Sequence, residues 1–224
     1  MNKNILSQII AGLFLASGAQ MAHASELTYA VVDTNQSQCF DTTDVVDKCP
    51  VVGESMHGQD AQYVGIMPSY QKNADGTVLD KNTGLIWESS IDRNDDGVAN
   101  AHDKMSYDNA LAFAKTSRVG GFDDWRVPTI KELYSIFLFD GEDVSPLHTK
   151  GTYHITPFLD QNVFDFAAGD TNNGDRLIDG QYLSSTKYVS TTMGRNEETI
   201  FGVNFVDGRI KGYGLNAQDE KKFY

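Results

Sequence analysis

The chain has 224 residues, 22% of them charged, and a formal net charge of −13 at pH 7. This length fits one domain, or one domain with an extension. An acidic surface repels nucleic acid, anionic lipid and sulfated polysaccharide, and it attracts cations. We therefore expect no nucleic-acid partner and no sulfated polysaccharide ligand.

Residues 1–24 have the layout of a secretory signal peptide. Lys3 supplies the positive start, residues 5–16 form a short apolar run, and Ala22-His23-Ala24 is a small-x-small cleavage site. Cleavage removes Lys3 and no acid, which changes the net charge from −13 to −14. We expect the mature chain to begin at Ser25 and to be secreted, periplasmic or held at the cell surface. No second long apolar run follows, so we expect no membrane insertion.

Cys39 and Cys49 are the two cysteines, and they lie in residues 25–62, which we interpret as an N-terminal extension of a domain over 63–224. After export, a local disulfide between them is the natural expectation. It would contribute roughly 2–3 kcal/mol. A metal thiolate pair or a catalytic thiol is a poorer interpretation, because no His or Cys partner stands at metal-ligand spacing.

Two segments have the pattern of antiparallel hairpins. In residues 76–88, apolar residues flank a Lys-Asn-Thr-Gly turn, and Trp87 is expected in the core. In residues 201–213, apolar residues alternate up to the tight turn at Asp207-Gly208. We expect the second hairpin to form the centre of a sheet.

Residues 92–103, DRNDDGVANAHD, carry the sharpest chemical signal. Acidic or amide side chains stand at positions 1, 3, 5, 9 and 12 of this segment and Gly97 at position 6, which is the ligand spacing of an EF-hand-type calcium loop. With a backbone carbonyl at position 7, the expected ligands are Asp92, Asn94, Asp96, Val98, Asn100 and Asp103. With Asp103 at position 12, the segment resembles the calcium loops of dockerin modules. A helix is expected over 106–117, and a solvated acidic loop is the open alternative.

A second acidic turn follows at residues 170–175. It could hold another cation, but it lacks the full calcium-loop spacing, and an ordinary Asx-rich loop is the alternative. The residues considered for it are Asp170, Asn172, Asp175 and Asp179.

Residues 120–139, GGFDDWRVPTIKELYSIFLF, organise the rest of the chain. Thr129 and Glu132 have the spacing of a capping box, which predicts a helix beginning after Thr129. Its apolar residues recur at the spacing of a core-facing helix. Trp125 and Arg126 precede it, and we interpret all four residues as scaffold. A ligand platform made by Trp125 and Arg126 is the open alternative.

The runs GTVLDKNTGLIWE, GGFDDWRVPTIKELYSI, YLSST and FGVNFVDGRIKGY resemble the Lcl C-terminal domain family, named after a bacterial collagen-like adhesin and long classed as a domain of unknown function. The resemblance covers residues 63–224. It implies an α+β, C-type-lectin-like fold related to formylglycine-generating enzymes, with short helices packed on antiparallel hairpins. The last residues look like the start of a strand, so truncation of this region is an open alternative.

From these features we expect an exported, non-catalytic binding or adhesion module with a calcium-stabilised loop. Its partner is an unknown extracellular ligand, either a glycan or a protein. One alternative is a structural repeat unit of a larger bacterial surface protein. A carboxylate-based hydrolase is a weaker alternative, because a chain with 31 acidic residues forms chance carboxylate pairs easily.

Overall fold

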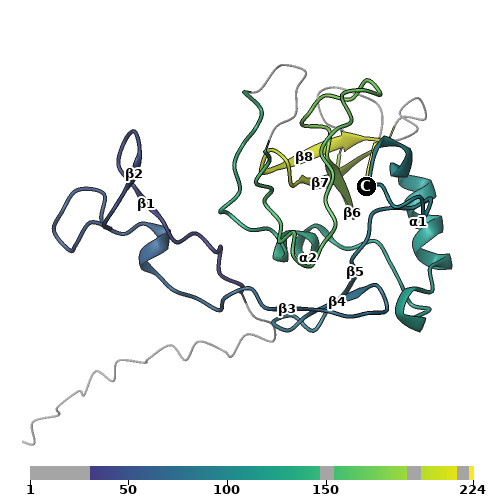
Figure 1. Cartoon of the computed structure of the whole chain (residues 1–224), viewed down its shortest axis with the longest axis horizontal. Coiled ribbons are helices and arrows are strands. Elements are labelled where there is room, and N and C mark those ends of the chain that lie inside the picture. Colours follow the sequence, from purple (N-terminus) through teal and green to yellow (C-terminus); the bar gives the residue numbers. More distant parts are fainter. Residues whose placement is uncertain (1–30, 147–153, 191–197, 216–221) are drawn as a thin grey trace, which may run out of the picture.

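The computed structural model describes residues 31–146, 154–190, 198–215 and 222–224. The expected signal peptide and Ser25 lie outside these residues. The described part consists of a body, built from two small antiparallel sheets and two α-helices, and an N-terminal arm that extends from it (Figure 1).

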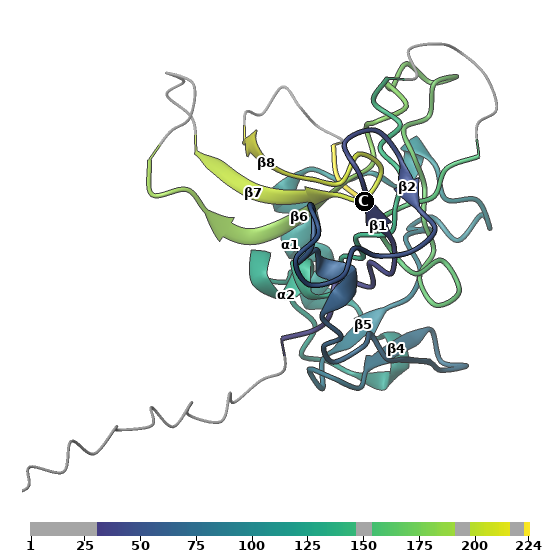
Figure 2. The same cartoon turned by 90° about the vertical axis from the view of Figure 1, so that its left-hand side faces the viewer.

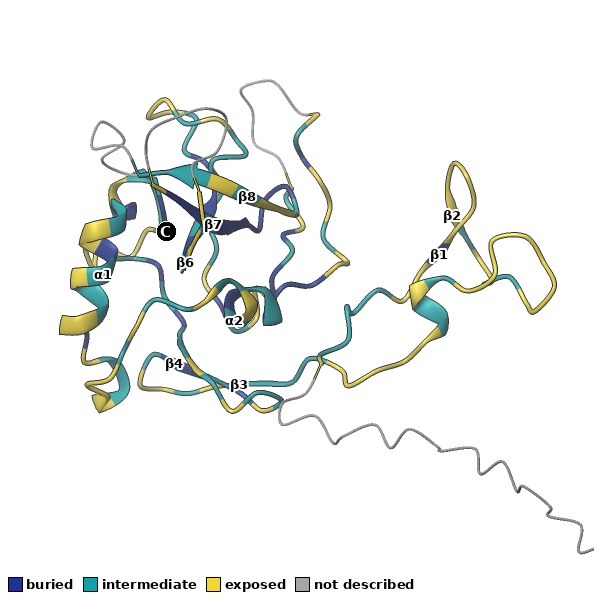
Figure 3. Ribbon diagram, turned by 180° about the vertical axis from the view of Figure 1, so that it is seen from behind, coloured by how far each residue is buried: buried dark blue, intermediate teal, exposed yellow. Residues whose placement is uncertain are grey.

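The arm, residues 31–66, carries a two-stranded hairpin. Strand β1 (Cys39–Phe40) pairs with β2 (Val45–Val46), and a disulfide joins Cys39 to Cys49, as the sequence predicts. A short helix, η1 (Asp60–Gln62), follows. Figure 3 shows that the arm is largely exposed. Its large exposed apolar side chains are Val31, Phe40, Val45, Val51, Val52, Met56, Tyr63, Val64 and Ile66.

The first sheet of the body has the strand order β3-β4-β5, with β3 at Tyr70–Lys72, β4 at Thr77–Asp80 and β5 at Ile86–Glu88. The predicted hairpin of residues 76–88 is therefore confirmed, and it places Val78 opposite Trp87. Since Gly84 in the turn has φ +74°, a glycine suits that position.

The two α-helices begin where the sequence predicts. Helix α1 (Tyr107–Thr116) is capped by the Ser106 hydroxyl, and the short helix η2 (Ala101–Asp103) precedes it. Helix α2 (Ile130–Ser135) begins with the complete Thr129–Glu132 capping box. It ends earlier than its apolar pattern suggests, but the residues that follow it remain buried.

The second sheet has the order β6-β7-β8, with β6 at Gln181–Lys187, β7 at Thr199–Asn204 and β8 at Arg209–Gly214. Figure 2 shows these strands side by side. Strand β7 is the central one, and the β7–β8 turn contains Gly208 at φ +73°. This confirms the second predicted hairpin, of which β7 is the central strand of the sheet and β8 lies at its edge.

Helix α2 lies between the two sheets and joins them through the main core (Figure 1). Its Leu133, Ile136 and Phe137, the last two just beyond the helix end, pack with Val78 of β4 and Val203 of β7. The architecture is α+β, with short helices on antiparallel sheets. No helix in the part of the chain described is long and apolar enough to cross a membrane.

The last described residues also belong to the body. Phe223 and Tyr224 are 2% and 5% exposed. Phe223 forms backbone bridges to Met105 and Gln181, which brings it between the loop before α1 and strand β6. Ahead of α2, the short helix η3 (Val119–Gly121) leads into the Trp125 segment.

Candidate functional site

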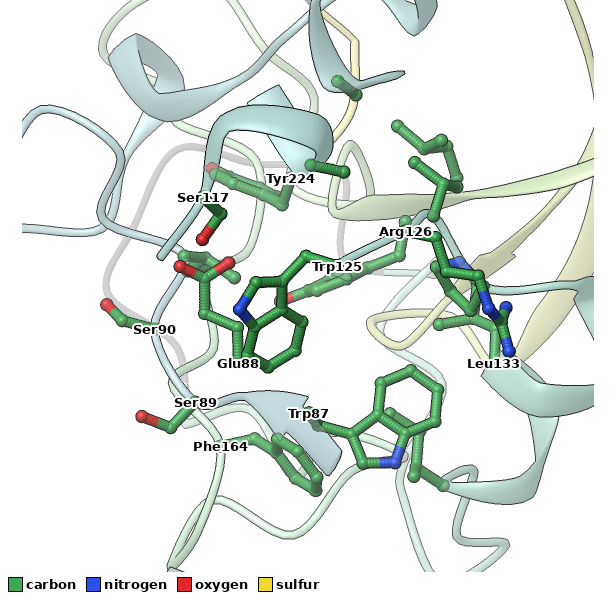
Figure 4. Close-up of a pocket in the computed structure, with 18 of the residues that line it drawn as sticks. Trp87, Glu88, Ser89, Ser90, Ser117, Trp125, Arg126, Leu133, Phe164 and Tyr224 are labelled. Carbon is green, nitrogen blue, oxygen red and sulfur yellow. The ribbon is translucent and has the colours of Figure 1, made fainter. Parts of the chain in front are cut away.

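A cavity of about 430 Å³ lies between β5, α1, the start of α2 and the segment 122–128, with β6 and Tyr224 contributing further lining. Both tryptophans of the chain, Trp87 and Trp125, line it. They come from different elements and project toward the same space (Figure 4). We take this cavity as the candidate site.

Trp125 is fixed by the loop that precedes it. Gly120 and Gly121 have φ +62° and +79°, and a Cβ on Gly120 would lie 2.6 Å from Cγ2 of Thr77. The loop is thus pressed against β4 in a conformation that favours glycine. The Trp125 indole Nε1 donates to the Val119 carbonyl at 3.1 Å, and the ring meets Phe122 edge to face.

Trp87 is held from the opposite side by strand β5. It is half-buried and packs against the main core, which agrees in part with the core position expected for it. Its indole Nε1 is buried and has no hydrogen-bond partner among the described residues. A buried N–H donor without a partner is rare and calls for an acceptor such as water or a ligand.

Glu88 and Arg93 form an ion pair at the cavity wall. Arg93 NH1 lies 2.6 Å from Glu88 Oε2, and both side chains are mostly buried. The guanidinium also lies 4.8 Å from the ring centre of Phe113 on α1. Figure 4 shows the Glu88 carboxylate beside Trp125, with the Ser117 hydroxyl close by. One edge of the cavity is therefore polar.

Arg126 and Glu132 form a second pair at the mouth. The guanidinium donates to both carboxylate oxygens of Glu132, at 2.7 and 2.6 Å. The hydrogen bonds from Arg126 lower the pKa of Glu132 to about 2, and bonds from Thr129 add to the effect. Glu132 is therefore ionised throughout the physiological range.

Two tyrosines form part of the wall. Burial raises the pKa of both Tyr182 and Tyr224, so both stay neutral. Tyr224 donates to the Ala168 carbonyl at 3.1 Å. The hydroxyl of Tyr182, like Nε of Arg93, is buried without a partner in the described ranges.

Different kinds of contact are made by the four residues interpreted as scaffold, Trp125, Arg126, Thr129 and Glu132. Thr129 and Glu132 cap α2, and Glu132 also holds Arg126, so these contacts are those of a scaffold. Trp125 is tied to the backbone yet presents the rest of its ring to the cavity. It therefore has features of both the scaffold and the ligand platform.

The expected calcium loop is only partly assembled. Asp92 and Asn94 accept hydrogen bonds from the amide of Asp96, and Asp92 also accepts from Gly97, which has φ +84°. Asn94 donates its side-chain amide to Asp96 at 3.1 Å. These three side chains surround one turn and offer the oxygen ligands that calcium prefers.

Asp103 and its neighbours are engaged elsewhere. The carboxylate of Asp103 is fully buried and accepts from the backbone amides of Arg93 and Asn100, both at 2.8 Å. Asn100 caps η2 and donates to the Val98 carbonyl. Within the described ranges, no three His, Cys, Asp or Glu side chains are placed to share an ion. Asp92, Asn94 and Asp96 therefore share one turn, whereas Asp103 closes the base of the loop through its two backbone contacts.

In the second acidic turn, a lysine supplies the positive charge. Lys104 Nζ lies 2.6 Å from Asp175 Oδ2 and also donates to the Asp179 carbonyl. Asp179 pairs with Arg176. The other two candidates, Asp170 and Asn172, stay within the turn, where Asp170 accepts from the Asn172 amide. The Asp175 carboxylate is thus held by the Lys104 ammonium group, and it also accepts from the backbone amide of Asp170 at 3.0 Å.

Sequence reasoning did not single out Glu88, Arg93, Phe113, Tyr182 or Lys104. Nothing in their local sequence marks them, because each acquires its role from a partner on another element or across a loop. The burial of Lys104 distinguishes it in the structure, but burial depends on tertiary packing and cannot be seen in the local sequence.

A family model of the Lcl C-terminal domain matches residues 76–223, well over half of the chain. The match begins at the turn before β4 and includes both tryptophans and nearly all of the cavity lining. No curated protein and no solved structure matches the chain.

Proposed function

Since the chain belongs to the Lcl C-terminal domain family, we propose that it is a non-catalytic binding module of an exported protein, with its ligand taken into the cavity between Trp87 and Trp125. The observation that carries this proposal is the position of the two indoles, which line one space from separate elements. The ligand is an extracellular glycan or a group presented by a protein. The Cys39–Cys49 disulfide supports export, since disulfides persist in oxidising compartments.

The cavity has the composition of a binding site. Small-molecule sites measure about 300–1,000 Å³ and combine aromatic walls with a few polar groups. Here the walls are Trp87, Trp125 and Phe113, and the polar groups gather at Glu88 and Ser117. Aromatic rings bring a large contact area with few rotatable bonds, which favours ligand binding.

The carboxylates of the cavity favour binding over catalysis. Glu132 is held ionised by Arg126, which makes it a poor general acid. Glu88 is bound to Arg93. A carboxylate-based hydrolase needs one carboxyl group with a raised pKa, whereas the pKa of Glu132 is lowered.

A glycan array tests the proposal directly. The exported chain should bind at least one glycan, Trp125→Ala should lose that binding, and Trp125→Phe should retain part of it. Tyr63→Ala is the matched control, because it removes an exposed aromatic ring from the arm. Equal binding by the wild-type chain and a folded Trp125→Ala variant would contradict a site in this cavity.

Calcium is the proposed stabilising ion of this module. Asp92, Asn94 and Asp96 would hold it, with water completing the oxygen shell that the ion requires. Binding would relieve the repulsion among the acids of residues 92–96 and would stiffen the connection to α1. We further infer that the α+β body is C-type-lectin-like, as the family resemblance implies.

The arm favours a second candidate function, a structural unit of a larger surface protein. Nine large apolar side chains are exposed on residues 31–66, outside the part of the chain that matches the family. A neighbouring unit of the same surface assembly would cover them. Deleting the arm should then abolish assembly and leave glycan binding intact, as measured by light scattering and by the array.

A further inference from the structure

We infer that the cavity takes an uncharged pyranose ring, stacked on the indoles with its hydroxyl groups toward the polar edge at Glu88, and that it discriminates against charged sugars and organic cations. This inference rests on the proposed function and specifies the ligand class of the same site. It follows from three properties of the lining: the aromatic faces, the balance of charge, and the unpartnered polar atoms.

The aromatic faces suit a ring with an apolar side. A pyranose presents C–H groups on its faces and hydroxyl groups around its edge. Indole rings are flat, and the electron-rich π face attracts the weakly positive hydrogens of such C–H groups. Trp125 is fixed through Val119 and Trp87 through β5, so both surfaces are already in place before the ligand binds.

The charges of the lining disfavour an anionic ligand. The six charged residues are two arginines and four acids, a net charge of −2: Arg93, Arg126, Glu88, Asp124, Glu132 and Asp165. Both arginines are already paired with glutamates, at 2.6 Å. A sulfate or carboxylate on the ligand would have to break one of these pairs or would approach the other acids of the lining, Asp124 and Asp165. Breaking the mostly buried Arg93–Glu88 pair is the costly case, because Arg126 is more exposed.

An organic cation is disfavoured for a different reason. The guanidinium of Arg93 stacks over Phe113 and already supplies a positive charge to that aromatic face. That aromatic face is therefore not open to a second cation. A quaternary ammonium group also offers no hydrogen-bond acceptor to a protein donor.

The unpartnered polar atoms favour a ligand that accepts and donates hydrogen bonds. Nε1 of Trp87, Nε of Arg93 and the hydroxyl of Tyr182 are buried with no partner in the described part of the chain. All three residues line the cavity. Buried polar groups in proteins are nearly always satisfied, by protein, water or ligand. A sugar hydroxyl can both accept from an N–H donor and donate to the Glu88 carboxylate.

The test uses the full exported chain and its own fluorescence. Trp87 and Trp125 are the only tryptophans, so tryptophan emission reports on this cavity alone. Titration should use the methyl glycosides of glucose, galactose and mannose, together with glucuronic acid, glucose 6-sulfate and choline. At least one neutral glycoside should shift the emission, and the charged compounds should bind at least tenfold more weakly.

A pair of variants tests the reason for the discrimination. Glu88→Gln keeps the size of the side chain but frees the charge of Arg93, so it should strengthen binding of glucuronic acid several-fold. Glu198→Gln is the control, because Glu198 forms an exposed pair with Lys187 away from the cavity. It should leave the preference unchanged. A Glu88→Gln variant with unaltered preference would contradict the charge argument.

The outcomes separate the two levels of inference. In one outcome, a charged compound (glucuronic acid, glucose 6-sulfate or choline) binds more tightly than any neutral glycoside and loses that binding in Trp125→Ala. This outcome would overturn the neutral-sugar inference and leave the binding module intact. Absence of an emission change with every compound would also overturn the inference. The binding module itself fails only if Trp125→Ala binds array glycans as the wild-type chain does.

Discussion

Lys104 reaches from the loop before α1 to the second acidic turn and places its ammonium group 2.6 Å from the Asp175 carboxylate, 71 residues further along the chain. The lysine side chain is only 2% exposed and lies 4.9 Å from the ring centre of Tyr224. This contact connects the calcium-type loop, the acidic turn and the C-terminal tyrosine.

Replacing Lys104 by methionine should therefore destabilise the body. The Asp175 carboxylate would lose its counter-charge in a mostly buried place, which costs about 3 kcal/mol. The free energy of unfolding, measured with urea, should fall by that amount. Lys187→Met is the matched control, since Lys187 pairs with Glu198 at the exposed surface, and it should leave the free energy of unfolding almost unchanged.

The pair Arg126–Glu132 should make stability depend on pH. The pKa of Glu132 is lowered from 4.5 to about 2, so its contribution is complete above pH 4.5 and is lost as the pH falls toward 2. Because the Arg126 side chain is 57% exposed, we expect only about 1 kcal/mol.

The measurement compares wild-type and Glu132→Gln melting temperatures between pH 3 and pH 7. Their difference should be largest near neutrality and should shrink on acidification. Glu142→Gln, on an exposed side chain, should change little at any pH. A difference that stays constant over this range would mean that Glu132 acts through packing and not through its charge.

Chelation tests the calcium proposal. An ion at a hundredfold excess over its dissociation constant stabilises a fold by about 2.7 kcal/mol. Removing calcium should therefore lower the melting temperature by several degrees. Asp96→Asn should cause a similar loss and make the protein insensitive to chelator.

Asp95→Asn provides the control within the same loop. Asp95 has φ +57°, a conformation that asparagine also tolerates, and it is not among the expected ligands. The variant removes the same charge and should keep the response to calcium. Calorimetry that detects no heat of binding at millimolar calcium would exclude the site.

The disulfide should stabilise the arm and leave the body largely unaffected. The arm meets the body through a few hydrogen bonds, including Phe139 N to Thr34 O at 2.8 Å and Asn35 Nδ2 to Asp140 Oδ2 at 2.6 Å. The double variant Cys39→Ser, Cys49→Ser should keep the main melting temperature. Trypsin should cleave this variant after Lys48 faster than it cleaves the wild-type chain there. Lys48 is exposed and directly precedes the second cysteine.

Cleavage in the body is the internal control. The rate after Lys115, on helix α1, should be the same with and without the disulfide, as followed by mass spectrometry. If the main transition fell by more than a few degrees, the arm would be a cooperative part of the body.

The features that the sequence predicted well depend on residues close together in the chain. The Thr129–Glu132 capping box, the Ser106 start of α1, the Asp207-Gly208 turn and the Cys39–Cys49 pair all formed as expected. Each is decided within about ten residues, where hydrogen-bond geometry and preferred backbone angles limit the alternatives. The family resemblance, confirmed over residues 76–223, rests on the same local motifs.

The candidate site was decided by tertiary packing. Trp87 and Trp125 stand in separate motifs, and the packing of the loop at Gly120 against β4 brings Trp125 to the cavity that Trp87 lines from β5. The calcium-type spacing of residues 92–103 was visible in the sequence. The sequence did not show that the Asp103 carboxylate accepts hydrogen bonds from two backbone amides. Local spacing determines which atoms could meet, whereas the packing of distant elements decides which of them are buried together and which partner each one takes.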